Sequence, residues 1–210
     1  MSPLRLLPLL GLLALVAGCG GGGEKSAAGC EVVGDPPPAA ARTAPKPTAK
    51  LDPSKTYEVT MQTNCGDFTI RLDPEQSPNA SASVVSLVRR GFFDNTIFHR
   101  ISTGFVVQGG DPTATGTGGP GYTTVDTPPS DAAYSHGVVA MAKTQVEPPG
   151  TAGSQFFIVL GPGAQLPPDY AIVGNVTDGL DVVDRIGTLG DANEQPTEVV
   201  EIEKATVTES

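Results

Sequence analysis

The sequence is poor in the side chains that hydrolases and metalloenzymes use for nucleophilic attack, proton transfer and metal binding. Its 210 residues include only two histidines, His99 and His136, and three cysteines. Neither histidine stands in a metal-ligand spacing such as His-Glu-x-x-His, and Ser154 does not lie in a Gly-x-Ser-x-Gly elbow. We therefore expect no metal site, no cofactor and no hydrolase chemistry in this chain.

Basic residues are also few. The chain has 13 lysines and arginines against 23 aspartates and glutamates, which gives a formal net charge of −10. A nucleic-acid-binding protein needs a basic face to neutralise phosphates, so this balance excludes nucleic acid as a partner. The same balance disfavours attraction to anionic lipid, and a membrane-associated form would therefore need a covalent anchor.

The N-terminus carries a candidate for such an anchor. Arg5 precedes an apolar run, residues 6–16, that is too short to span a bilayer comfortably, and the run ends in Leu15-Val16-Ala17-Gly18-Cys19. Small residues before a cysteine resemble a bacterial lipobox, in which Cys19 is lipidated after cleavage. The sequence thus predicts a lipoprotein signal peptide over residues 1–18 and tethering to the outer face of the bacterial cell membrane. An ordinary secretory signal with a chance cysteine is the alternative.

Residues 19–55 have no helical or strand periodicity. Four glycines directly after Cys19 form a flexible spacer, and residues 31–54 are rich in Pro, Ala, Lys and Thr. This composition predicts a lipid-anchored, flexible and partly polyproline linker. Export would leave Cys30 and Cys65 in an oxidising compartment, where they could form one disulfide. Two unpaired thiols are the alternative, because Cys30 lies in a segment that need not approach Cys65.

The folded domain is predicted to occupy residues 56–208. Apolar and polar residues alternate over residues 57–61 and 68–72, with turn residues between them, which predicts a β-hairpin. A helix is expected next, because Ser77 can cap its first turn and Gly91 can end it in the left-handed conformation.

Further short apolar segments follow as predicted strands. They are residues 97–111, as two short runs joined by Ser-Thr-Gly, and residues 138–142, 156–160, 170–176 and 200–202. A second, short helix is expected around residues 180–186. Many short strands, only two helices and no internal repeat predict a mainly β fold, a closed antiparallel barrel.

One strand segment, residues 97–111, places strongly hydrogen-bonding side chains among apolar ones. Arg100 and Gln108 stand among phenylalanines and valines, which predicts an apolar pocket with a cation and an amide at its edge. His99 is more typical of a structural hydrogen-bonding residue than of a general base. The glycine-rich residues 113–124 lack Gly-Lys-Ser/Thr and no helix pattern follows them, so a structural loop is predicted there instead of a phosphate site.

Two sequence blocks resemble a known family. Residues 98–111, with Phe98-His99-Arg100-Ile101 and Gly104 to Asp111, are similar to the signature of the cyclophilin-type peptidyl-prolyl isomerases, and so are residues 153–158, Gly-Ser-Gln-Phe-Phe-Ile. The agreement covers about residues 57–208. This resemblance implies a closed eight-stranded antiparallel barrel capped by two helices. It also implies an enzyme that accelerates rotation about X-Pro bonds and needs neither metal nor cofactor.

The resemblance implies roles for individual residues as well. Arg100 is expected to be the catalytic cation that holds the carbonyl of the substrate proline, with Phe105 and Gln108 as further catalytic residues. The remaining substrate-binding residues that it implies are Val106, Ala142, Lys143, Phe157, Leu166 and Tyr170. Gln165 stands where cyclosporin-sensitive members have tryptophan, which predicts weak inhibition by that drug.

These observations together predict an exported, membrane-tethered and monomeric prolyl isomerase that assists the folding of proline-containing polypeptides. The alternative is a binding module, a chaperone or scaffold that grips proline-containing peptides with little turnover. The presence of Arg100, Phe105 and Gln108 favours the enzyme.

Overall fold

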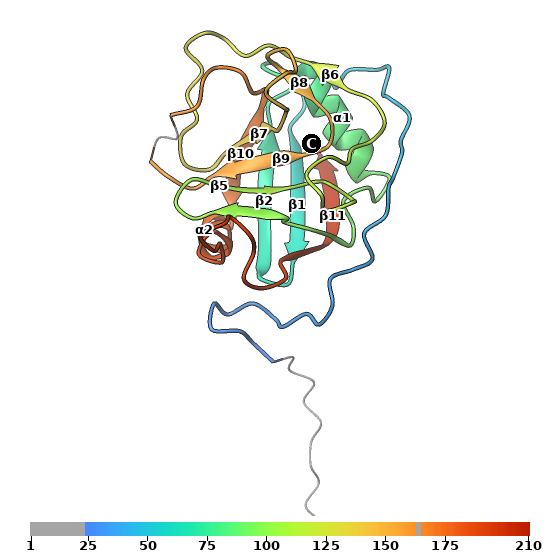
Figure 1. Ribbon diagram of the computed structural model, residues 1–210. Helices are drawn as coiled ribbons and strands as arrows, with labels where there is room; N and C mark the ends of the chain where they lie inside the picture. The colour runs from blue at the N-terminus through green and yellow to red at the C-terminus, as the bar shows by residue number, and fades with distance from the viewer. Residues whose placement is uncertain (1–23, 163–164) are drawn as a thin grey trace, which may run out of the picture.

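The computed structural model describes residues 24–162 and 165–210 (Figure 1). The predicted signal peptide and Cys19, the predicted lipidation site, lie outside these residues. Among the residues that are described, no helix is both long and apolar enough to cross a membrane. The elements in chain order are β1 (Tyr57–Thr63), β2 (Gly66–Leu72), α1 (Pro78–Val88), β3 (Thr96–Ile97), β4 (Arg100–Ser102), β5 (Val106–Gly109), β6 (Thr124–Val125), β7 (Val138–Met141), β8 (Thr151–Ala152), β9 (Phe156–Val159), β10 (Ile172–Asp178), α2 (Leu180–Gly187) and β11 (Glu201–Glu209).

Alternation of apolar and polar side chains builds the first hairpin. Every second residue of β1 from Tyr57 to Thr63 is buried, and β2 pairs with β1 antiparallel, with Thr63 opposite Gly66. Gly66 has a φ of +118°, a conformation that residues with a Cβ rarely adopt. The predicted hairpin is therefore confirmed, and its turn depends on that glycine.

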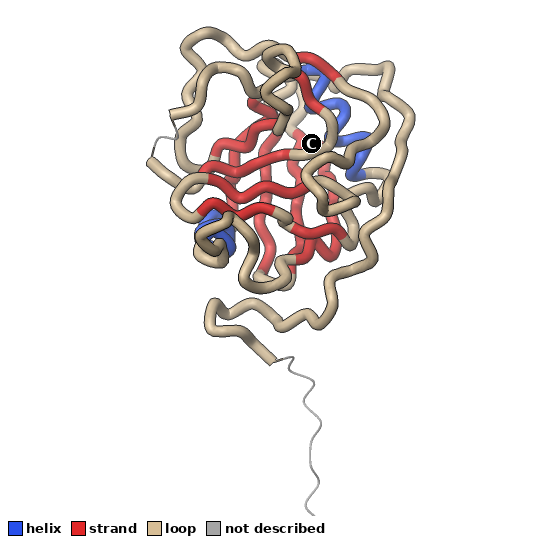
Figure 2. The backbone as a smooth tube through the Cα atoms, in the orientation of Figure 1, coloured by secondary structure: helices blue, strands red, loops and turns tan. Residues whose placement is uncertain are grey.

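The main sheet is antiparallel, and it curls around a core (Figure 2). It contains nine strands in the order β3-β11-β1-β2-β10-β7-β9-β5-β4, and β6 and β8 form a separate two-stranded sheet. The mainly β architecture with two helices is confirmed, but the prediction of eight strands closed into a barrel is wrong.

The difference arises between residues 96 and 102. Thr96 and Ile97 pair with β11, whereas Arg100 to Ser102 pair with β5, so this one segment supplies both edge strands of the sheet. Phe98 and His99 lie between them, and Phe98 turns its ring into the core, where it is fully buried. Among the described residues no strand ladder joins the two edges.

Helix α1 covers one end of the sheet, and its N-terminus is satisfied by a residue distant in sequence. Ser77, the predicted cap, makes no capping hydrogen bond and donates its hydroxyl to the carbonyl of Ile172 at 2.6 Å. The buried Asp126 accepts hydrogen bonds from the backbone N–H groups of Asn79 (3.3 Å) and Ala80 (2.6 Å). The capping prediction is thus wrong, because a carboxylate from the loop after β6 occupies the positive end of the helix.

Side chains on the two faces of the sheet belong to two clusters. Val107 of β5 faces the large core, which also contains Phe98 and Phe156. Its neighbour Val106 faces a smaller cluster, as alternation along a strand requires. The buried members of this smaller cluster are Val106, Tyr134, Val138, Ala140, Phe157, Val159 and Ile172. The second cluster supports the candidate site.

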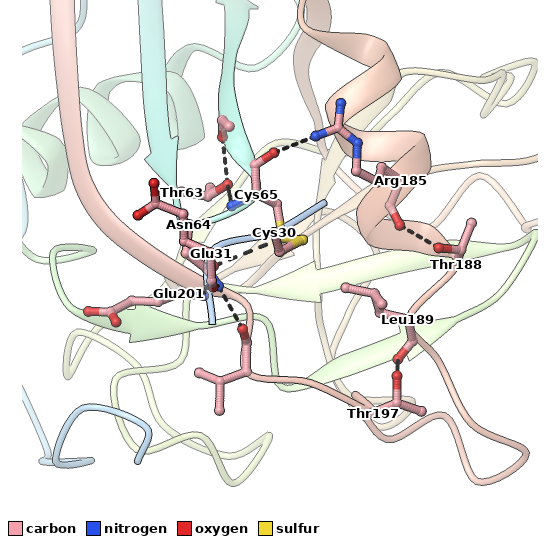
Figure 3. The surroundings of a disulfide bond; sticks show 12 residues. Cys30, Glu31, Thr63, Asn64, Cys65, Arg185, Thr188, Leu189, Thr197 and Glu201 are labelled. Carbon is pink, nitrogen blue, oxygen red and sulfur yellow. Dashed lines mark hydrogen bonds between the residues drawn. A yellow bond between two sulfur atoms is a disulfide. The ribbon is translucent and has the colours of Figure 1, made fainter. Parts of the chain in front are cut away.

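The segment predicted as a linker makes specific contacts with the domain. Residues 24–55 contain no helix or named strand, but in Figure 1 their blue trace follows the outside of the domain past α1 to the start of β1. Cys30 and Cys65 form a disulfide, which joins this segment to the β1–β2 turn (Figure 3). Asn64 donates its side-chain amide to the carbonyl of Glu31 at 2.9 Å, and Arg185 of α2 donates to the carbonyl of Cys65 at 2.9 Å.

Candidate active site

Strand register brings the two predicted polar residues together. Arg100 of β4 lies opposite Gln108 of β5, and Gln108 lies opposite Phe157 of β9. Arg100 Nη1 donates to Gln108 Oε1 at 3.2 Å, and Gln108 Nε2 donates to Gln155 Oε1 at 3.0 Å. Gln155 Nε2 in turn donates to the carbonyl oxygen of Gly118 at 3.0 Å. A continuous line of hydrogen bonds therefore runs from the guanidinium to the glycine-rich loop.

Glu194 holds the other side of the Arg100 side chain. Arg100 Nε donates to Glu194 Oε2 at 2.6 Å, and the hydroxyl of Ser102 donates to Glu194 Oε1 at 2.7 Å. The hydrogen bonds from Arg100 and then from Ser102 lower the pKa of the Glu194 carboxyl, which keeps it ionised at neutral pH. Within the described chain no group accepts a hydrogen bond from Arg100 Nη2. The guanidinium is thus fixed through Nε and Nη1, and Nη2 is free to bind a ligand.

An apolar surface lies beside this pair. Val106 and Phe157 are nearly fully buried and form its floor, while Phe105, Leu166 and Tyr170 are half-buried around it. The rings of Phe157 and Tyr170 meet edge to face, with centroids 5.3 Å apart. Gln165, which directly precedes Leu166 in the chain, is exposed. The structure therefore brings the predicted apolar residues into one group, which we call the apolar pocket.

Lys143 is placed differently from the other predicted site residues. Its side chain is only 4% exposed, and its ammonium lies 3.8 Å from Asp169 Oδ2 and 5.5 Å from the ring centroid of Tyr170. It also donates to the backbone carbonyls of Thr144 (3.3 Å) and Glu147 (3.2 Å). The charge of Lys143 is thus engaged by its own loop and by Asp169, and both Lys143 and the adjacent Ala142 line a neighbouring hollow.

A hollow lies beside Gln108. It has a volume of about 590 Å³, and we call it the polar cleft. Its lining residues are Gln108, Gly116 to Thr123, Ala142 to Thr144, Glu147 and Gly153 to Gln155. Gln108 lines this cleft and lies opposite Phe157 of the apolar pocket, so an extended ligand could contact both.

Comparison with known proteins identifies the family. The family model described as "Cyclophilin type peptidyl-prolyl cis-trans isomerase/CLD" matches residues 58–207. The chain belongs to this family. A peptidyl-prolyl cis-trans isomerase of Arabidopsis thaliana is 39% identical over 150 residues, covering 69% of this chain and 90% of the relative. A probable peptidyl-prolyl cis-trans isomerase A of Mycobacterium leprae is 38% identical over 167 residues, covering 70% of this chain and 90% of the relative.

Solved cyclophilin structures resemble the fold as well. The crystal structure of a Cryptosporidium parvum cyclophilin-type isomerase matches with a TM-score of 0.67 and 33% identity, covering 73% of this chain and 98% of that one. A second crystal structure of that protein, obtained in the presence of the dipeptide Ala-Pro, matches with a TM-score of 0.66, 33% identity, and coverage of 72% and 98%. The cyclophilin-type domain is thus matched almost over the full length of these structures.

Two residues of this cyclophilin-type site were not predicted from the sequence. Gln155 lies within the block that carries the resemblance, so its amide was available to sequence reasoning. Glu194 lies in an irregular loop before β11, and only the fold brings it to Arg100, 94 residues away. No local pattern marks it.

The two histidines take no part in the site. Both ring nitrogens of His99 are buried, and within the described chain neither has a hydrogen-bond partner. Burial lowers the pKa of His99, against a smaller opposing effect of Asp111. His136 lies elsewhere, 2.6 Å from Asp184 of α2. The described residues include no group of three or more His, Cys, Asp or Glu side chains that could hold a metal ion.

Proposed function

We propose that this cyclophilin-type isomerase is exported, tethered by a lipid at Cys19, and acts on X-Pro bonds of exported polypeptides to assist their folding. The observation that carries the catalytic part is the fixed Arg100–Gln108 pair beside the apolar pocket. The Cryptosporidium relative was crystallised in the presence of Ala-Pro, which supports a proline-containing ligand for the same fold.

The proposed mechanism is selective binding of a twisted amide. Amide resonance gives the peptide bond a rotation barrier of ~18–20 kcal/mol, and uncatalysed prolyl isomerisation takes roughly 10–100 s. A site that binds the twisted bond more tightly than either planar form lowers this barrier, with a tenfold gain in rate for every ~1.4 kcal/mol. No nucleophile is needed for such a reaction.

Each group of the site has a part in this proposal. Phe105, Val106, Phe157 and Leu166 bind the proline ring, which fixes one side of the rotating bond. Tyr170 extends the same wall. Arg100 binds the prolyl carbonyl oxygen through Nη2 and favours a pyramidal nitrogen as resonance is lost. Gln108 and Ala142 contact the backbone on the other side of the bond.

A protease-coupled assay with an Ala-Pro peptide tests the catalytic proposal. The wild-type protein should accelerate isomerisation, and Arg100→Ala should lower kcat/KM by about 100-fold or more, the range for removing one preorganised donor. Arg100→Lys is the matched control, because it keeps the charge but loses the Nε contact with Glu194. If the wild type were no more active than background, the enzyme proposal would be refuted and the peptide-binding module would take its place.

The anchor is tested separately. Cys19→Ser should move the protein from the membrane fraction to the soluble fraction of a bacterial host, and Cys30→Ser serves as the control that should stay with the membrane. Retention of Cys19→Ser in the membrane would contradict lipidation. The Cys30–Cys65 disulfide supports an oxidising location, because such bonds persist outside the cytosol.

A further inference from the structure

The glycine-rich loop that lines the polar cleft has little regular structure of its own. We call residues 111–123 the cleft loop; they contain no helix or strand. The Asp111 carboxylate accepts hydrogen bonds from the backbone N–H groups of Thr113 (2.7 Å), Thr115 (3.2 Å) and Gly118 (3.0 Å). Gly118 approaches so closely that a Cβ there would overlap Asp111 Oδ1. Four glycines increase the conformational entropy that this loop loses when it becomes ordered, so contacts from outside the loop help to hold it.

The outer side of the cleft loop is held by the N-terminal segment. We call residues 36–46 the brace. The backbone N–H of Ala40 donates to the carbonyl of Pro112 at 3.0 Å, and that of Ala44 donates to the carbonyl of Pro120 at 3.0 Å. Lys46 Nζ donates to the carbonyl of Thr123 at 2.8 Å. These three bonds are spaced along the whole cleft loop, from its second residue to its last.

The brace is itself fixed to the domain between these contacts. Arg42 Nη1 donates to the carbonyls of Phe92 (2.7 Å) and Asp94 (2.8 Å) in the turn after α1. Ala44 packs against the large core. The Cys30–Cys65 disulfide secures the segment before the brace, and β1 begins eleven residues after it, at Tyr57. Several prolines in the brace restrict its unfolded conformations, which lowers the entropy lost on docking.

The cleft loop thus lies between the brace and the polar cleft. Its inner side carries the Gly118 carbonyl that binds Gln155, and Gln155 binds Gln108. A displacement of the loop would therefore reach the line of hydrogen bonds that ends at Arg100. The family match begins only at residue 58, so the brace lies outside the part of the chain that the family defines.

We propose that the brace is a positioning element of the peptide-binding site, which holds the cleft loop as the wall for peptides that extend beyond the apolar pocket. This inference rests on the proposed isomerase function for its substrate. The order of the cleft loop and its affinity for extended proline peptides can both be measured without turnover.

The test uses the full chain with Arg42→Ala and Lys46→Ala combined. Lys50→Ala is the matched control, since Lys50 is exposed and makes no hydrogen bond among the described residues. The double variant removes the hydrogen bonds of Arg42 to the turn after α1 and of Lys46 to Thr123. Because solvent replaces much of what they contribute, we expect amide exchange at Thr115 and Gly118 to become about 3- to 10-fold faster. The Kd of a ten-residue proline peptide should rise by a similar factor, while that of Ala-Pro stays within twofold.

Three results would overturn the proposal. The first is unchanged amide exchange in the double variant, and the second is faster exchange with unchanged affinity for the long peptide. The third is an equal loss of affinity for both ligands in a double variant whose thermal melt matches that of the wild type, because the brace would then not act on the extended part of the site. An inactive wild-type protein would refute the proposed function alone, because exchange and peptide affinity would still report on the brace.

Discussion

Replacement of Glu194 separates the positioning of Arg100 from the stability of the fold. Glu194 has a φ of +61°, a left-handed conformation that costs a residue with a Cβ about 1 kcal/mol. Glu194→Gly removes the carboxylate that binds Arg100 and also relieves this backbone cost. Its free energy of unfolding should therefore stay close to that of the wild type, whereas Glu194→Ala should be less stable.

The expected loss of activity follows from the geometry of the pair. The Nε–Oε2 distance is 2.6 Å, but the side chains of Arg100 and Glu194 are 33% and 43% exposed, so solvent screens the interaction. Charge-assisted hydrogen bonds at such partly exposed sites contribute about 1 kcal/mol. If this free energy positions the guanidinium in the transition state, kcat/KM falls about 5-fold in Glu194→Gly, mainly through kcat.

We would measure kcat and KM by steady-state kinetics with an Ala-Pro peptide. Urea unfolding of the same samples would give the free energy of unfolding. Glu194→Gln is the control, because its amide oxygen still accepts one hydrogen bond; we expect intermediate activity. Since the folded pKa of Glu194 is lowered, its contribution to stability is present above its unfolded pKa and is lost as the pH falls through its folded pKa. Wild-type kcat/KM in Glu194→Gly would refute the positioning role.

Three other predictions concern the rest of the molecule. Cys30→Ser/Cys65→Ser should lower the free energy of unfolding in urea by up to about 3–4 kcal/mol, the value for a closed loop of 35 residues, and a reductant should change the wild type but not the variant. Burial lowers the pKa of His99 in the folded protein, so the wild type should lose stability as the pH falls below the unfolded-state pKa of about 6.5. His99→Gln should lose less stability over the same range. Urea unfolding at pH 7 and pH 5 measures this, and an equal loss of stability in both proteins would contradict the prediction. The exposed Gln165 should give weak inhibition by cyclosporin, and Gln165→Trp should lower the inhibition constant; tight inhibition of the wild type would refute the prediction.

Local patterns predicted the local parts of the fold. The hairpin of β1 and β2 follows from alternation and turn residues within 16 positions, and the structure has it. The cap of α1 does not follow from Ser77, because Asp126, 46 residues after Ala80, competes for the same N–H groups. The strand count fails for a similar reason, since the division of residues 96–102 depends on two partners far apart in the chain.

The candidate site shows the same division. Arg100 and Gln108 were accessible from one sequence block because they lie eight residues apart on neighbouring strands. Glu194 was not accessible, since its contact with Arg100 arises from tertiary structure alone. The proline-rich composition of residues 31–54 predicts an extended backbone, but it does not reveal which carbonyls of the cleft loop that backbone will bind.

The most direct test of the central claim is exchange spectroscopy by NMR on an Ala-Pro peptide with a catalytic amount of protein. This measurement reports cis-trans interconversion, and a titration with the same peptide gives its Kd separately. We predict that the wild type produces exchange cross-peaks between the cis and trans resonances within a second. Arg100→Ala should bind the peptide with a Kd within a few-fold of the wild type and give no such cross-peaks. Undiminished exchange in Arg100→Ala would contradict the assignment of the guanidinium to the twisting amide.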